Sequence, residues 1–164
     1  MKHTIAILVE NEAGALSRIV GLFSQRNYNI DSLTVAPTQD GSLSRVTIVT
    51  AGHDEVIEQI CKQLHRIVSV FRVVDLSETP HIERELLLLK VRAVGSQRDE
   101  IKRVADIYGA RIVDVTPTTY VIEFSAKSRA LDSLLDAIDE KQLIEVTRSG
   151  VVGIARGERA VNTT

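Results

Sequence analysis

The chain has 164 residues, of which 44% are hydrophobic and 26% charged, with a formal net charge of −2. This composition is typical of a globular protein in water, and the length allows one large domain or two small ones. Basic residues are spread along the chain and no apolar run approaches twenty residues, so the sequence predicts neither a nucleic-acid partner nor a membrane span.

The first half of the chain predicts alternating strands and helices. Apolar, β-branched runs indicate strands, and apolar residues at helical spacing indicate helices. Turn-forming residues from Thr38 to Ser42 separate two of the strands. The predicted strands are 4–10, 30–37, 43–50 and 68–76, and the predicted helices are 15–25 and 54–65. The order βαββαβ is that of a ferredoxin-like motif.

A polar break at 77–81, which contains Pro80, precedes a second half with the same order of elements. Its predicted strands are 83–93, 111–116, 120–124 and 143–148, and its predicted helices are 98–108 and 128–138. No element is predicted for the tail from Ser149, which contains glycines and ends in polar residues. We therefore expect an α+β protein with two ferredoxin-like βαββαβ domains in tandem, at 1–78 and 79–164.

Domains of roughly 80 residues bury a small fraction of their unfolded surface and are only marginally stable alone. A four-stranded sheet also leaves an edge strand open for pairing. Both properties favour a homodimer formed through the first domain.

The turn between the first strand and the first helix is the candidate ligand site. Gly14 and Ala15 carry no bulky side chain, so the N–H groups at the start of the helix are open to an anion. The side chains of Asn11 and Asn29, or nearby carbonyl groups, can accept hydrogen bonds from an ammonium group. A small zwitterion fits this pattern, although the turn can also be a plain helix start with Asn11 as its local cap.

The sequence predicts no catalytic centre. The four histidines are far apart and indicate scattered surface residues, with no spacing typical of metal ligands. Cys61 lies beside an apolar helix face and is interpreted as a small buried side chain. The single cysteine and the absence of a signal peptide in this sequence favour a cytoplasmic protein. The sequence therefore favours a binding module over an enzyme.

Several segments together resemble the regulatory (small) subunits of acetolactate synthase, also called acetohydroxyacid synthase. The resemblance covers almost the whole chain and is far more specific than the Asn11–Gly14 motif alone, which many amino-acid-sensing ACT domains share. The segments that carry it are 9–18, 21–26, 28–38, 43–45, 59–65, 112–117 and 148–153.

The resemblance implies an N-terminal ACT domain that dimerises and binds valine between the two subunits. Asn11, Gly14, Ala15 and Leu16 match the effector turn of the family, and Asn29 and Ile30 match the segment that completes the pocket from the other subunit. The chain would itself be non-catalytic. It would activate a separate catalytic subunit and confer feedback inhibition by valine in branched-chain amino acid biosynthesis.

Thiamine diphosphate, magnesium and FAD would reside on that catalytic subunit, with no cofactor in this chain. The hairpin 36–43 is a candidate for the activating surface, or else an ordinary exposed hairpin. Two other classes remain open: a free-standing tandem ACT protein that senses an amino acid and regulates transcription or another enzyme, and an enzyme in its own right.

Overall fold

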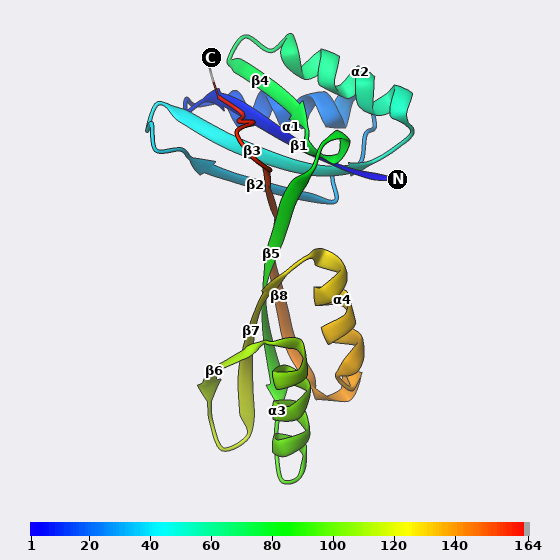
Figure 1. Cartoon of the computed structure of the whole chain (residues 1–164), viewed down its shortest axis with the longest axis vertical. Coiled ribbons are helices and arrows are strands. Elements are labelled where there is room, and N and C mark those ends of the chain that lie inside the picture. Colours follow the sequence, from blue (N-terminus) through cyan, green and yellow to red (C-terminus); the bar gives the residue numbers. More distant parts are fainter. Residues whose placement is uncertain (163–164) are drawn as a thin grey trace. The chain divides into compact units, whose positions relative to one another are not determined.

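The computed structural model describes residues 1–162 and shows an α+β chain with two four-stranded antiparallel sheets, each packed against two helices (Figure 1). One compact unit comprises Met1–Ile82 together with the chain from Val151 onward, and the other comprises Glu83–Gly150. The two predicted βαββαβ motifs are thus confirmed. The last part of the second sequence half, however, belongs to the first unit.

The first unit has the element order predicted for it. Its sheet has the strand order β2-β3-β1-β4, so that β2 and β4 form the edges. The second strand begins at Ser32 rather than at Ile30. The elements are β1 (Lys2–Glu10), α1 (Ala15–Gln25), β2 (Ser32–Pro37), β3 (Leu43–Ala51), α2 (Asp54–His65), β4 (Val70–Asp75) and a 3₁₀ turn at Leu76–Glu78.

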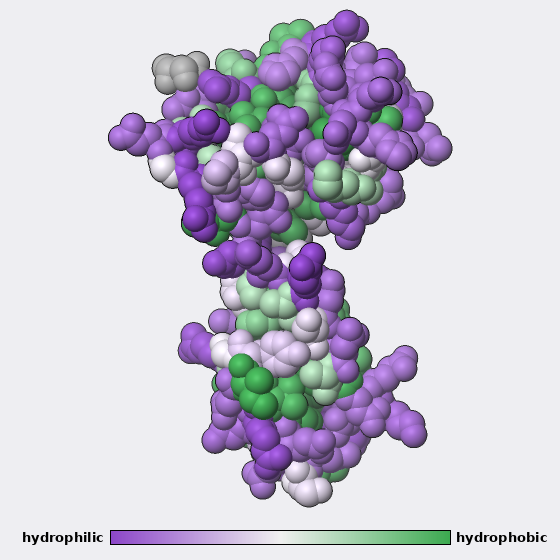
Figure 2. All heavy atoms as spheres, turned by 45° about the vertical axis from the view of Figure 1, so that its right-hand side comes forward, coloured by the Kyte–Doolittle hydropathy of each residue, from purple (hydrophilic) through white to green (hydrophobic). Residues whose placement is uncertain are grey.

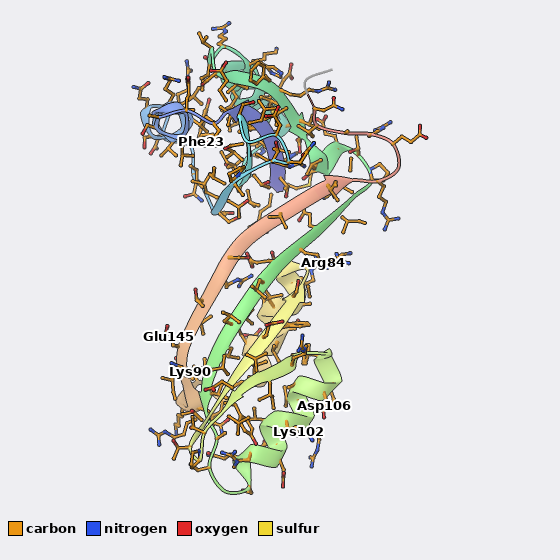
Figure 3. All side chains as sticks on the ribbon, turned by 90° about the vertical axis from the view of Figure 1, so that its left-hand side faces the viewer. Phe23, Arg84, Lys90, Lys102, Asp106 and Glu145 are labelled. Carbon is orange, nitrogen blue, oxygen red and sulfur yellow. The ribbon has the colours of Figure 1, made fainter. Side chains whose placement is uncertain are left out.

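Alternating residues of the strands form the core of the first unit. Ile5, Ile7 and Val9 of β1 point to the helix side because successive residues of a strand face opposite sides. Helix α1 contributes the fully buried Phe23, which Figure 3 labels, and α2 contributes Leu64. The two helices therefore cover one face of the sheet.

The second unit repeats this arrangement with the strand order β6-β7-β5-β8. Leu87, Leu89 and Val91 of β5 face a core that Ile101 of α3 and Leu131 of α4 complete. The elements are β5 (His81–Arg92), α3 (Gln97–Tyr108), β6 (Arg111–Val115), β7 (Thr119–Ala126), α4 (Ser128–Ala137), a 3₁₀ turn at Glu140–Gln142 and β8 (Leu143–Ala155).

A buried ion pair stabilises the second unit. The Glu85 side chain is 6% exposed, and Arg148 Nε donates to its Oε1 at 2.7 Å. Arg148 Nη1 also donates to Asp132 Oδ1 at 2.7 Å. Partial burial alone would lower the pKa of Arg148, but the hydrogen bonds to Asp132 and Glu85 outweigh it and raise the pKa. Arg148 is therefore the charge that compensates the buried Glu85 carboxylate.

Strand β8 continues past its predicted end at Arg148 as far as Ala155, and its last residues pack on the first unit. Thr34 Oγ1 donates to the Val151 carbonyl at 3.3 Å, and Arg45 Nη2 donates to the Gly153 carbonyl at 2.8 Å. Thr34 and Arg45 adjoin Leu33 and Val46, which face the helix-side core, so they lie on the other face of the sheet. The end of β8 therefore covers part of the sheet face opposite the helices.

On the face shown in Figure 2, hydrophilic side chains predominate on both units, with hydrophobic groups between them. Such a mixture is usual, because a folded surface always retains apolar atoms. None of the helices among residues 1–162 has the length and hydropathy of a membrane-spanning segment.

Candidate functional site

The turn between β1 and α1 presents free hydrogen-bond donors, as predicted. Gly14 occupies the N-cap position with a φ of 88°, and no side chain caps the helix. The Ala15 N–H donates to the Glu12 carbonyl at a long 3.4 Å, and the helical ladder begins with Arg18 N donating to the Gly14 carbonyl at 3.0 Å. Within residues 1–162, the N–H groups of Leu16 and Ser17 make no hydrogen bond. These two donors lie at the positive end of the helix dipole, where an anion is stabilised.

Arg18 adds a positive charge beside this turn. Its Nη2 atom lies 3.7 Å from the position that a Cβ at residue 14 would take. Its Nη1 atom donates to Glu12 Oε1 at 3.3 Å and to Ser69 Oγ at 3.1 Å. Arg18 was not predicted as a site residue, although its position four residues after Gly14 places it on the same side of the helix.

Asn11 lies in the same turn but does not cap the helix, so the interpretation of Asn11 as a local cap is wrong. Its Nδ2 group donates to the Gly41 carbonyl at 3.0 Å, and its backbone N–H donates to the Ser42 carbonyl at 2.8 Å. Asn11 therefore ties the turn to the β2–β3 hairpin. The Ala15 side chain is buried, whereas that of Leu16 is 39% exposed.

Asn29 and Ile30 lie at the opposite end of α1. The Asn29 side chain is exposed and donates to the Asp31 carboxylate, while Ile30 packs against the edge of the core. The 11 residues of α1 separate this segment from the Gly14 turn by about 16 Å, at 1.5 Å per residue. One chain therefore brings Asn11, Gly14, Ala15 and Leu16 together, but it does not bring Asn29 and Ile30 to them.

The remaining reactive side chains are held in structural roles. Burial, with the nearby charges of Asp75 and Glu78, raises the pKa of the Cys61 thiol to about 11, so the thiol remains protonated at neutral pH. His3 is buried, and its Nδ1 lies 2.7 Å from Asp75 Oδ2. The expectation that all four histidines lie on the surface is therefore wrong for His3, which is buried because it lies on β1 between β3 and β4. Residues 1–162 hold no group of three side chains that could bind a metal ion.

Both sequence halves match family models. Residues 5–72 match the ACT domain of acetohydroxyacid synthase (AHAS) small subunits, and residues 84–157 match the small subunit of acetolactate synthase. The first match contains the Gly14 turn, and the second contains β5 to β8 almost entirely.

Named relatives match over essentially the whole chain. The acetolactate synthase small subunit of Haemophilus influenzae is 56% identical over 162 residues, which are 98% of this chain and 99% of the relative. The isozyme 3 small subunit of Escherichia coli is 52% identical over 160 residues, 97% of this chain and 98% of the relative. The crystal structure of the acetolactate synthase small subunit from Thermotoga maritima superposes with a TM-score of 0.88 at 32% identity, covering 97% of this chain and 99% of that one. The chain therefore belongs to the family of acetolactate synthase small subunits.

Proposed function

We propose that this chain is the regulatory subunit of a cytoplasmic acetolactate synthase, which binds and activates a separate catalytic subunit and makes it sensitive to valine. Membership of the family supports the partnership. The observation that carries the amino-acid site is the Gly14 turn, with two unpaired N–H groups and Arg18 beside it. In this proposal thiamine diphosphate, magnesium and FAD reside on the catalytic subunit.

The turn offers complementary groups for each part of valine. The carboxylate would bind the N–H groups of Leu16 and Ser17 beside Gly14, where the helix dipole favours negative charge. The isopropyl group would lie against the exposed part of Leu16. Asn11, which fixes the turn to the hairpin, would hold the turn in this shape.

Asn29 and Ile30 would complete the site from a second copy of the chain. Leu16 and Val20 lie one helical turn apart on the flank of α1 that faces away from α2, and both are partly exposed. If two α1 helices pack antiparallel through this flank, the start of each helix meets the end of the other, so one two-fold axis creates two equal sites. In each site Asn29 would hold the carboxylate from across the dimer, Ile30 would contact the isopropyl group, and Asp31 would accept the ammonium group.

A shared site gives valine control over the dimer. If valine binds one relative placement of the two subunits more tightly than another, it shifts the population toward that placement. A coupling free energy of about 1–3 kcal/mol is sufficient for regulation. We expect a Kd of roughly 10–100 μM, or about −5.5 to −7 kcal/mol. A small apolar pocket discriminates by only a few kcal/mol, so leucine and isoleucine should bind more weakly rather than not at all.

Reconstitution tests this function. Adding the purified chain to the purified catalytic subunit should raise the rate of acetolactate formation, and valine should lower that rate again. Calorimetric titration of the chain with valine, leucine and isoleucine gives the selectivity. If the chain binds valine but neither associates with nor activates the catalytic subunit, the free-standing amino-acid sensor is the correct alternative.

A further inference from the structure

The first unit has a groove between α1 and the end of α2, on the surface of the helix layer. Its volume is about 480 Å³. Arg18, Gly21 and Leu22 of α1 and Arg26 directly after it line one side, and Gln63 and Ile67 line the other. We refer to these six residues as the α1–α2 groove.

Gly21 keeps this groove open at a cost to the helix. A glycine inside a helix is about 1 kcal/mol less favourable than alanine. If Gly21 carried a Cβ, no other atom of residues 1–162 would lie within 4 Å of it, leaving aside the backbone of the same helix and the two neighbouring residues. No packing contact within the described chain therefore requires glycine at this position. The space above it is available to a group from outside the chain.

The surface around the groove is basic, although the whole chain has a net charge of −2. The two stretches that supply it, 13–30 and 59–68, contain no Asp or Glu. The cations in or directly after the two helices are Arg18, Arg26, Lys62 and Arg66. Among residues 1–162, Arg18 and Lys62 have an acidic partner, namely Glu12 and Glu58, whereas Arg26 and Arg66 have none. These two guanidinium groups create a positive potential that attracts an acidic partner.

Apolar groups lie within this basic surface. Leu22 and Ile67 are part of the groove, and Val68, the next residue, is 98% exposed. Arginine next to exposed apolar groups is the composition found at the centre of protein interfaces. The groove is open to solvent and does not enclose a ligand, which favours a protein segment over a small molecule.

We propose that the α1–α2 groove is the docking site for an acidic segment of the acetolactate synthase catalytic subunit, an inference that rests on the proposed function. A carboxylate of that segment pairs with Arg26, and its backbone lies over Gly21 against Leu22 and Ile67. Leu22 and Arg18 are on one flank of α1, and Leu16 and Val20 are on the other, so docking leaves the proposed dimer flank free.

Arg18 links the groove to the effector turn. It lines the groove, and its Nη2 lies 3.7 Å from the Cβ position of Gly14. Arg18 therefore borders both the groove and the effector turn, while the docked carboxylate pairs with Arg26.

Two substitutions that spare the effector turn test the docking site. Gly21→Gln fills the groove with a helix-forming side chain, and Arg26→Glu reverses the unpaired charge. Their matched controls are Gly21→Ala, which adds only a methyl group, and Arg103→Glu, which reverses an exposed arginine of α3 in the second unit. Binding to the immobilised catalytic subunit is measured by biolayer interferometry between about 50 and 200 mM salt.

Gly21→Gln and Arg26→Glu should each raise the Kd for the catalytic subunit at least about tenfold, while both controls stay within about twofold. Arg26→Glu should also reduce the salt dependence of binding. All four variants should bind valine and sediment like the original chain.

Unchanged binding by both groove variants would overturn the docking site. Altered sedimentation of the groove variants alone would overturn it too, because the groove would then join copies of this chain. An original chain that fails to bind the catalytic subunit would reject the proposed function, and the docking site with it.

Discussion

Replacing Gly14 by alanine, asparagine and aspartate in turn separates backbone strain from charge at the effector turn. Gly14 has a φ of 88°, which costs an L-residue roughly 1–2 kcal/mol, with Asn and Asp tolerating it better than Ala. All three variants should therefore lose stability in urea denaturation. Only the aspartate adds a negative charge, and asparagine has nearly the same shape.

The expected effect of this charge follows from the position of Arg18. A Cβ at residue 14 would lie 3.7 Å from Arg18 Nη2, so an aspartate there can pair with Arg18 and occupy the place proposed for the valine carboxylate. Two like charges about 4 Å apart repel by about 4 kcal/mol at an effective dielectric constant of 20. This energy corresponds to roughly a thousandfold in Kd, which moves valine binding from the micromolar range to tens of millimolar.

Calorimetry and inhibition assays measure this effect directly. Valine should give no detectable heat with Gly14→Asp, while Gly14→Asn and Gly14→Ala should bind it within about tenfold of the original Kd. The reconstituted synthase should remain activated by all three variants, and only the aspartate variant should be insensitive to valine.

Two results would refute this reasoning. If Gly14→Asp bound valine as tightly as Gly14→Asn, the carboxylate would not lie at this turn. If all three variants lost valine binding to the same extent, binding would depend on the glycine backbone itself and not on the charge balance beside Arg18.

Four further predictions concern stability and reactivity. Arg148→Met leaves the buried Glu85 carboxylate without its cation and should lower the free energy of unfolding by about 3–5 kcal/mol in urea titrations. The exposed Arg111, whose ion pair spans 4.0 Å, gives the control, and Arg111→Met should cost less than about 1 kcal/mol. Cys61 is partly buried, and its pKa is raised to about 11, so it should react slowly with a thiol reagent at pH 8 until the protein unfolds. Rapid labelling of the native protein would contradict the raised pKa. The folded state holds this proton more tightly than the unfolded chain does, so the contribution of Cys61 to stability should decrease as the pH rises from 9.0 towards 11. Gly21→Ala should raise the free energy of unfolding by about 0.5–1 kcal/mol, since the added methyl group has open space, and a loss of stability would show a hidden contact at that position.

Local patterns explain why most of the fold could be predicted. The alternation of Ile5, Ile7 and Val9 and the spacing of Ile19 and Phe23 each place residues on one face, and these residues are buried in one core. The bounds of α1 and α2 agree with the predicted ranges for the same reason. Such signals depend on neighbours in the sequence, so they are visible without the structure.

The end of β8 could not be predicted in this way. Its partners Ser32, Thr34 and Arg45 lie more than a hundred positions earlier in the chain, and no local periodicity records such a contact. The Gly14 turn was predicted because a glycine between a strand and a helix indicates open N–H groups, and this signal is visible in neighbouring residues. Arg18 and the α1–α2 groove were missed because their role depends on side chains that meet only in the folded unit. Asn29 and Ile30 remain a prediction, since they need a second chain to reach the turn.

The path of the chain makes the second unit an insertion. The backbone leaves the first unit after Ile82 and rejoins it at Val151, so the inserted cassette is tethered at both of its ends. Truncation of the chain at the polar break, 77–81, would remove the segment from Val151 onward and leave Thr34 and Arg45 without their partners in it. An isolated effector-binding fragment should therefore be made by excising the cassette and splicing Ile82 to Val151 through a flexible linker.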